Sequence, residues 1–97
     1  MKVAWTGPAE QDRSDIWDYL TARDPQAAAR LDARFSAAAR RLGDFPSAGR
    51  AGLVLGTREL IPHPGYRLVY EIFGETVWIL ALIHTSRQWP PPELAEP

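Results

Sequence analysis

An arginine and a histidine, Arg67 and His84, are the side chains whose types and predicted spacing point first to chemistry. Residues 56–90 predict three successive β-strands, and the pair Gly74-Glu75 suits a two-residue type II′ turn between the last two. The cross-strand pairs that follow from this turn are Phe73 with Thr76, Glu71 with Trp78, Val69 with Leu80, Arg67 with Leu82 and Gly65 with His84. Arg67 and His84 then become diagonal neighbours on the sheet face away from the core. A guanidinium there could bind an anion, and an imidazole could act as a general acid or base near neutral pH.

Each of these two residues also has a purely structural interpretation. A half-buried guanidinium needs an anionic partner, so Arg67 could form a salt bridge with Glu71 on its own strand or with Glu59 on the neighbouring strand. His84 could simply end its strand with a hydrogen bond to nearby backbone, and this is the interpretation that we favour for the histidine.

The same register predicts which side chains of the hairpin form the core. One face would carry the residues fit for burial, namely Tyr66, Leu68, Tyr70, Ile72, Val77, Ile79, Ala81 and Ile83. The opposite face would carry Arg67, Val69, Glu71, Phe73, Thr76, Trp78, Leu80, Leu82 and His84. Strand side chains alternate between the faces, so this assignment depends entirely on the register.

The remaining residues predict the elements that position this hairpin. They are a short strand over residues 2–5, a helix over 8–22, a helix over 25–42 and a strand over 53–61. The order is therefore β-α-α-β-β-β. It predicts an α+β fold in which a helical hairpin packs on one face of a small, mostly antiparallel sheet.

The second predicted helix is clearly amphipathic. Asp24 is its expected N-cap and Gly43 its expected end. Its apolar positions, spaced by three and four residues, are Ala28, Leu31, Phe35, Ala38 and Leu42. Three arginines, Arg30, Arg34 and Arg41, fall on one side of this helix. Such a stripe is usually a solvated face, but it could also meet an acidic segment of a partner or pair with acids of the first helix.

Composition favours a small cytoplasmic protein with a single domain over residues 1–97. The formal net charge of −1 argues against strong non-specific binding to nucleic acid. No apolar run approaches the roughly 18 residues that cross a bilayer, so no membrane partner is expected. The chain has no cysteine, which excludes disulfides and thiolate metal sites. The histidines, His63 and His84, are isolated, so no metal or other cofactor is expected.

The chain resembles a known family over nearly its whole length. The segments that carry the resemblance are WDYL, DPQAAARL, FPSAGR, GTREL, GYRLVYEI and VWILALIHTSRQWP, in that order. Together they resemble the RelE/ParE superfamily of toxins from bacterial toxin–antitoxin pairs. The resemblance implies a cognate antitoxin as partner in a hetero-oligomer. The antitoxin would lay an amphipathic helix and an extended strand into the groove between the helical hairpin and the sheet, and onto an open sheet edge.

The resemblance also implies roles for several residues if the chain belongs to the nuclease branch. Arg58, Arg67 and Arg87 would then surround one phosphate of messenger RNA, with His84 in an acid–base role. The sequence departs from that pattern at two places. Leu60 stands where a second basic residue is expected, and the tyrosine expected shortly after Arg87 is missing. These departures favour a ParE-like toxin that is not an enzyme and acts by binding and poisoning DNA gyrase.

Two other functions remain open from the sequence. One is a ribosome-dependent messenger RNA endonuclease, and the other is a non-toxic module that only binds an antitoxin. Residues 89–97 form a Pro-rich tail. Trp89, at its start, could fill a pocket in a partner or stack on a base, but we expect it to pack over the sheet edge and anchor the chain end.

Overall fold

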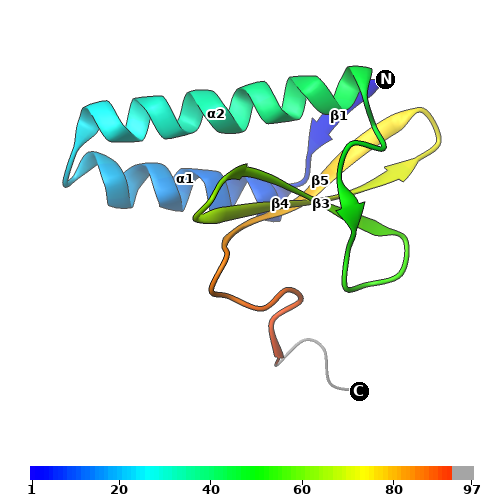
Figure 1. Ribbon diagram of the computed structural model, residues 1–97. Coiled ribbons are helices and arrows are strands. Elements are labelled where there is room, and N and C mark those ends of the chain that lie inside the picture. Colours follow the sequence, from blue (N-terminus) through cyan, green and yellow to red (C-terminus); the bar gives the residue numbers. More distant parts are fainter. Residues whose placement is uncertain (93–97) are drawn as a thin grey trace.

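A helical hairpin lies on one face of a five-stranded sheet (Figure 1). The computed structural model describes residues 1–92. The helices are α1 (Gly7–Thr21) and α2 (Pro25–Asp44), and the strands are β1 (Lys2–Trp5), β2 (Arg50–Ala51), β3 (Thr57–His63), β4 (Tyr66–Phe73) and β5 (Thr76–His84). The strand order is β1-β5-β4-β3-β2, with β1 parallel to β5 and the other pairs antiparallel. The predicted α+β fold is therefore confirmed, with one additional two-residue strand, β2.

Both helices begin at the signals that the sequence carries. The Thr6 hydroxyl accepts a hydrogen bond from the Ala9 amide at 3.3 Å, and a proline occupies the first turn of α1. The Asp24 carboxylate accepts from the Ala27 amide at 3.1 Å, as predicted for the N-cap of α2. Helix α2 continues through Gly43 to Asp44, two residues beyond the predicted end.

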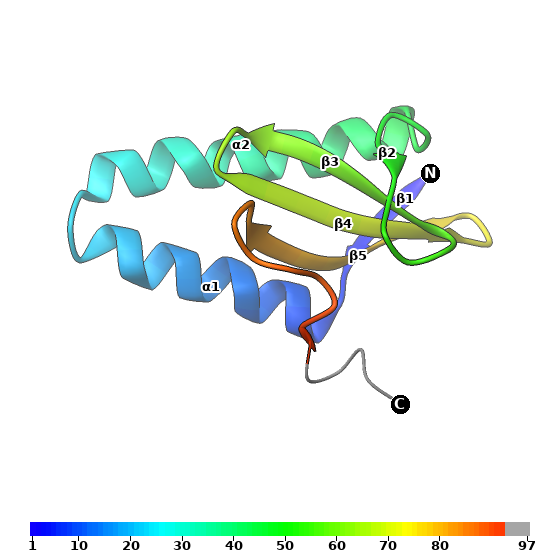
Figure 2. The same ribbon diagram turned by 60° about the horizontal axis from the view of Figure 1, so that its bottom comes forward.

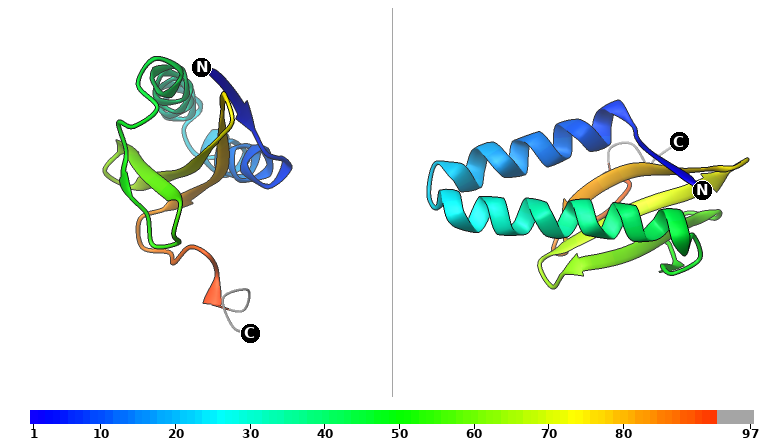
Figure 3. Two further views of the ribbon diagram at one scale, coloured as in Figure 1. Left: turned by 90° about the vertical axis from the view of Figure 1, so that its right-hand side faces the viewer. Right: turned by 90° about the horizontal axis from the view of Figure 1, so that it is seen from above.

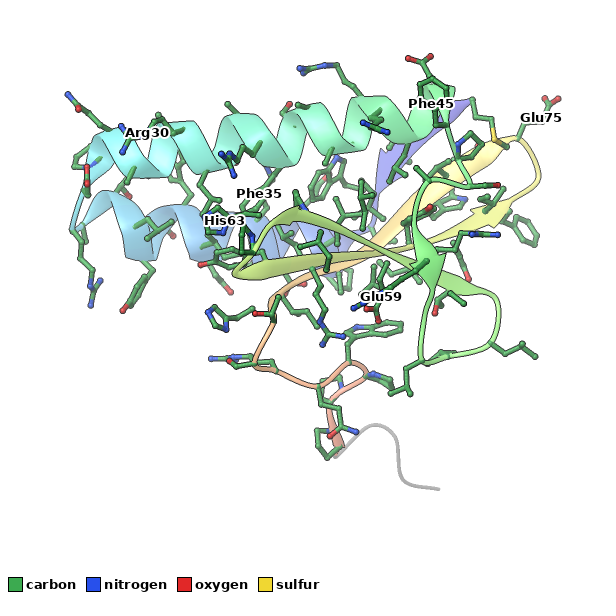
Figure 4. All side chains as sticks on the ribbon, viewed as in Figure 1. Arg30, Phe35, Phe45, Glu59, His63 and Glu75 are labelled. Atoms are coloured by element: carbon green, nitrogen blue, oxygen red, sulfur yellow. The ribbon has the colours of Figure 1, made fainter. Side chains whose placement is uncertain are left out.

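The core lies between the helical hairpin and the sheet. Its buried side chains come from α2, from β4 and β5, and from α1 through Ala9. The largest are Phe35, Leu42, Leu68, Tyr70, Val77, Ile79 and Leu82. In Figure 4, Phe35 points from α2 toward the sheet. This sheet face is called the helix-facing face below, and the other is called the outer face.

The predicted register holds only for the half of the hairpin next to the turn. Phe73 lies opposite Thr76, and Gly74 has a positive φ of 61°, as a type II′ turn requires at its first position. After Tyr70 pairs with Ile79, the register shifts, so that Leu80 is an extra residue on β5. The following pairs are Val69 with Ala81, Leu68 with Leu82, Arg67 with Ile83 and Tyr66 with His84. A β-bulge of this kind moves every later side chain to the other face.

The bulge overturns the predicted face assignment over residues 81–84. Leu82, expected on the outer face, is 2% exposed and belongs to the core. Ala81 and Ile83, expected in the core, instead lie on the outer face with Val69 and Arg67. The predicted strand over residues 53–61 is also displaced, because residues 52–56 form a loop and β3 begins only at Thr57.

The C-terminal segment, residues 85–92, covers part of the outer face (Figure 2). The Thr85 amide donates to the Gly65 carbonyl at 2.8 Å, which fixes the start of this segment to the β3–β4 turn. Val69 and Ala81, which lie on this outer face, are both buried. The predicted tail of residues 89–97 falls partly outside the described residues, since the description ends at Pro92. No helix within residues 1–92 is long and apolar enough to cross a membrane.

Candidate functional site

Arg67 is neutralised by a carboxylate of the protein itself. Its Nη1 lies 3.2 and 3.3 Å from the two carboxylate oxygens of Glu59 on β3, and its Nη2 donates to the carbonyl of Arg87. Glu59 is only 5% exposed and the Arg67 side chain 16%. A second guanidinium, that of Arg50, lies 3.6 Å from Glu59. The predicted structural alternative, a salt bridge from Arg67 to Glu59, is therefore confirmed. Figure 4 shows Glu59 below the sheet, on the outer face.

The Arg67–Glu59 pair has one unsatisfied atom. The Nε of Arg67 is buried and has no hydrogen-bond partner among residues 1–92. Buried ion pairs are stable only when their remaining donors and acceptors are well placed, and removing one member leaves a buried charge. Neither member of the Arg67–Glu59 pair can therefore be removed from the outer face without leaving a buried charge. Glu59 also offsets the positive charge of Arg67, which a phosphate would need in order to bind there.

His84 and Arg67 are not neighbours, contrary to the prediction. His84 lies opposite Tyr66, so the bulge places it on the other face from Arg67. Its ring packs edge-to-face on the ring of Tyr66, with centroids 5.5 Å apart. Its Nδ1 accepts a hydrogen bond from the Ser86 amide at 3.1 Å. This is the favoured alternative for His84, a histidine at a strand end bonded to nearby backbone.

The three arginines of the expected phosphate site do not lie together on one face of the sheet. Arg58 lies opposite Tyr70 on the helix-facing face, and its Nη1 donates to the Gly49 carbonyl at 2.8 Å. Arg67 lies on the outer face. Arg87 is exposed on the C-terminal segment, where its backbone carbonyl accepts from Arg67. The structure therefore brings the Arg87 backbone to Arg67 and separates Arg58 from both.

The FPSAGR segment is held to β4 by Tyr70, a buried tyrosine that was predicted only as a core residue. The Tyr70 hydroxyl accepts from the Gly49 amide at 2.8 Å and donates to the Pro46 carbonyl at 2.7 Å. A Cβ on Gly49 would lie 2.7 Å from the Glu59 carbonyl oxygen and 2.8 Å from the Tyr70 ring. Glycine is therefore required for this close approach.

A groove runs along the free edge of β1, between the ends of the two helices. Figure 3 shows β1 passing from the start of α1 toward the end of α2, where the helices diverge. Two hollows of about 430 and 490 Å³ adjoin there, and Trp5 lines both. The lining side chains of the two hollows include Trp5, Val3, Arg13, Trp17, Asp32 and Arg40. The outer edge of β1 has no strand partner within residues 1–92.

An ion pair between the helices forms one wall of this groove. Arg13 of α1 makes a two-pronged contact with Asp32 of α2, at 2.7 and 2.9 Å. The hydrogen bond to Asp32 raises the pKa of Arg13 above its usual value, so the guanidinium stays charged. The same guanidinium lies 4.8 Å from the ring of Trp5. Trp5, Arg13 and Asp32 could not be recognised as a group from the sequence, because only the tertiary packing of three elements brings them together.

The predicted partner-binding arginines Arg30, Arg34 and Arg41 are all exposed on α2. Figure 4 labels Arg30 near the start of α2. Arg41 packs over the ring of Phe45, 5.8 Å from its centroid. Within residues 1–92 none of the three forms an ion pair, so their charges are available to a partner.

Trp89 is half-buried and helps to enclose a hollow of about 540 Å³. The other walls are β5, through Leu80 and Ile83, and the first turns of α1, through Asp12. Asp12 is half-buried and accepts the Leu82 amide at 3.0 Å. Burial raises the pKa of the Asp12 carboxyl above its usual value, the Leu82 hydrogen bond lowers it in part, and the nearby charge of Asp15 raises it further.

The described part of the chain holds no group of three or more histidine, cysteine or acidic side chains placed to bind a metal ion. On the outer face, Arg50 and Arg67 share the carboxylate of Glu59. The groove beside β1 has the shape and the free strand edge that an extended polypeptide could occupy.

Comparison with known proteins identifies the family. Residues 3–89 match the family model described as the ParE toxin of the type II toxin–antitoxin system parDE. A protein of Sinorhizobium fredii with the name "Putative toxin Y4kP" is 37% identical over 90 residues, which cover 92% of this chain and 93% of that protein. Toxin RelE2 of Caulobacter vibrioides is 34% identical over 86 residues, which cover 89% of this chain and 97% of that protein.

Two solved structures share the fold. The chromosomal ParDE toxin–antitoxin system from P. aeruginosa matches with a TM-score of 0.76 at 23% identity, covering 87% of this chain and 95% of that one. The YoeB/ParE toxin from Agrobacterium tumefaciens matches with a TM-score of 0.63 at 20% identity, covering 87% and 98%. The resemblance found in the sequence is thus confirmed by family model, relatives and fold together. This chain belongs to the ParE toxin family of type II toxin–antitoxin systems.

Proposed function

We propose that this toxin stops growth in the bacterial cytoplasm by binding and poisoning DNA gyrase, and that a cognate antitoxin neutralises it by direct binding. The observation that carries the proposal is the internal neutralisation of Arg67 by Glu59 at 3.2 Å. Stabilising the charge that develops on a phosphate requires donors aimed at that phosphate and not already satisfied. Here the central arginine is bonded within the protein, and Arg58 is bonded to the Gly49 carbonyl on the other face of the sheet.

A messenger RNA endonuclease is the second candidate. One relative carries the name toxin RelE2, and Arg87 is exposed, with its backbone carbonyl accepting a hydrogen bond from Arg67. For this activity Arg67 would have to leave Glu59, and the buried carboxylate would then keep only the longer contact to Arg50. Such an exchange is costly in a buried position, which weighs against this candidate.

The groove beside β1 suits the antitoxin. An exposed strand edge can accept an added strand through backbone hydrogen bonds, and the neighbouring hollows can receive its side chains. Trp5 lines both hollows, and the exposed Arg40 supplies positive charge along one of them. A segment that leaves this groove across α2 would next meet the exposed arginines, which would favour acidic residues at that point. On the outer face, we propose that Trp89 contacts the target, gyrase.

The deciding experiment is a short induced expression of the toxin alone in bacteria, with incorporation of thymidine and of amino acids followed in parallel. Early loss of thymidine incorporation with a DNA-damage response is the expected result. Early loss of amino-acid incorporation that disappears in the R67A/R87A double variant would replace the proposal by messenger RNA cleavage. No growth defect from soluble protein would leave the third candidate, a module that only binds an antitoxin.

Purified gyrase gives the direct form of this test. We expect the wild-type protein to trap cleaved DNA in a reaction that contains gyrase, DNA and ATP. The R67A/R87A variant should retain this effect if it stays folded, because neither side chain is assigned a role in binding gyrase. Its folding can be checked by circular dichroism before the assay.

A further inference from the structure

The loop between β2 and β3 holds three consecutive large aliphatic side chains in solvent. Leu53 is 71% exposed, Val54 38% and Leu55 100%. A run of three exposed aliphatic residues is unusual in a soluble protein unless a partner covers it. These three residues are called the leucine knob below.

The leucine knob is held in a defined conformation. The Thr57 amide and the Thr57 hydroxyl both donate to the Val54 carbonyl, at 3.0 and 2.6 Å, and the Gly52 amide donates to the Thr57 carbonyl at 2.8 Å. Gly56 has a φ of 88°, which disfavours any residue with a side chain. A Cβ on Gly52 would lie 2.3 Å from the Thr57 hydroxyl oxygen. Two glycines and a buried threonine thus fix a short loop whose tip does not contact the core.

This fixed shape matters for binding. A loop that is already ordered loses little conformational entropy when it inserts into a partner, so its apolar side chains contribute more of their burial to affinity. Interface hot spots lie in well-packed pockets from which water is excluded, and an exposed aliphatic tip can fill such a pocket. The leucine knob therefore has the shape of a side-chain group that inserts into a partner's pocket, and not the shape of a pocket that receives one.

The leucine knob is remote from the groove proposed for the antitoxin. The groove lies at β1, and the knob joins β2 to β3 at the opposite edge of the sheet. The knob lies at the same end of the molecule as the β4–β5 turn (Figures 1 and 2), and Phe73 beside that turn is 75% exposed. The pairing of Thr57 with Glu71 brings the base of the loop next to the end of β4.

The two surfaces suit partners of different kinds. A disordered antitoxin segment has no pocket of its own before it binds, so it needs a groove on the toxin. A protruding knob needs the reverse, a folded partner that already contains an apolar pocket. We infer that the leucine knob is the contact that inserts into the folded target protein of this toxin, which is gyrase if the proposed function holds. Phe73 lies at the border of the same contact.

The test compares two matched double variants in the full chain. L53S/L55S replaces both exposed leucines by polar residues, and L53M/L55M keeps an apolar tip of similar size. Neither position touches the core, so both variants should fold like the wild type. We expect L53S/L55S to lose growth arrest and to need at least about a hundredfold more protein to trap cleaved DNA with purified gyrase. We expect L53M/L55M to stay within about threefold of the wild type.

A third variant separates the shape of the knob from its chemistry. G56A keeps all three aliphatic side chains but places an alanine at a positive φ, which disturbs the loop. If the fixed shape is required, the activity of G56A should be higher than that of L53S/L55S and lower than that of L53M/L55M. Full activity in G56A together with loss in L53S/L55S would refute the role of the fixed shape, while the apolar contact itself would stand.

The outcomes also separate this inference from the proposed function. If wild-type protein leaves gyrase unaffected but L53S/L55S still abolishes growth arrest, the target is another folded protein and the knob remains its anchor. If L53S/L55S poisons gyrase or arrests growth as well as the wild type, the inference is wrong. The inference also fails if L53S/L55S only alters self-association in size-exclusion chromatography, or only reduces sedimentation with lipid vesicles, because the knob would then serve a second copy or a membrane.

Discussion

Replacing Asp12 by alanine should destabilise the protein through a backbone group in another element. Strand β1 pairs with β5 only as far as Ile79, and the bulge at Leu80 follows directly. The next amide on that edge, Leu82, donates to the Asp12 carboxylate of α1 at 3.0 Å. In the D12A variant this half-buried amide has no carboxylate to bind.

The expected loss follows from the strength of one charge-assisted hydrogen bond. Bonds of this kind contribute about 1.5–3 kcal/mol when buried, and a buried donor left unpaired costs about 1–3 kcal/mol. Asp12 is only half-buried, so water can partly replace the carboxylate. We therefore expect D12A to lower the free energy of unfolding by about 1–2 kcal/mol, and each kcal/mol should lower the Tm by about 4–8 °C in a domain of this size.

The isosteric variant D12N separates the hydrogen bond from the charge. Its amide oxygen can still accept the Leu82 amide, so D12N should lose less than about 1 kcal/mol at neutral pH. Burial raises the folded-state pKa of Asp12 above the ordinary value of 3.8. The stabilisation from this raised pKa is fully present below 3.8 and is lost as pH rises through the folded-state value. The wild type should therefore be more stable relative to D12N near about pH 3 than near about pH 7.

Urea denaturation of the three proteins at the two pH values measures all of these differences. Two results would refute the reasoning. One is an alanine variant within about 0.5 kcal/mol of the wild type at neutral pH, which would mean that the Leu82 amide needs no protein acceptor. The other is a wild type that loses stability relative to D12N on acidification, since this requires a lowered pKa for Asp12.

Three further changes test the outer face and the loop that leads to it. Replacing Glu59 by alanine leaves the buried Arg67 guanidinium unpaired and should cost about 3–5 kcal/mol in urea unfolding, and a loss below about 1 kcal/mol would show that the pair is solvated. In Y70F the Gly49 amide loses its buried acceptor, so Tm should fall in proportion to about 1–3 kcal/mol, whereas an unchanged Tm would contradict the bond at 2.8 Å. G49A should lower the yield of folded protein because its Cβ meets backbone at 2.7 Å; Gly7, with open space around it, is the matched control, and equal yields of G49A and G7A would argue against a tight approach.

Most of the architecture follows from local signals in the sequence. The two helices have N-caps, prolines in their first turns and apolar positions every three or four residues, so their starts were predictable. The β4–β5 turn was predictable because glycine at a positive φ suits its first position. Strand β2 was not, since Arg50-Ala51 has only two residues within a turn-rich segment. The late start of β3 was missed because an exposed aliphatic run has the composition of a strand.

The candidate site was less predictable than the fold, and the bulge in β5 is the reason. Residues 77–83 are all apolar: the helices cover one face of this strand, and the C-terminal segment covers part of the other, although Trp78 stays exposed. Without alternation between polar and apolar residues, nothing in the sequence marks where an extra residue enters the ladder. One inserted residue was enough to part His84 from Arg67 and to move Leu82 into the core.

The pairing of β1 with β5 has a consequence for synthesis in the cell. The Thr6 amide donates to the Ile79 carbonyl, so β1 cannot pair in the sheet until β5 has been synthesised, after both helices and strands β2 to β4. Until then the nascent chain has a helical hairpin whose apolar side is uncovered, a state prone to aggregation and to proteolysis. Truncated chains that end before β5 should therefore be unable to fold. A shortened messenger RNA would then give no functional toxin.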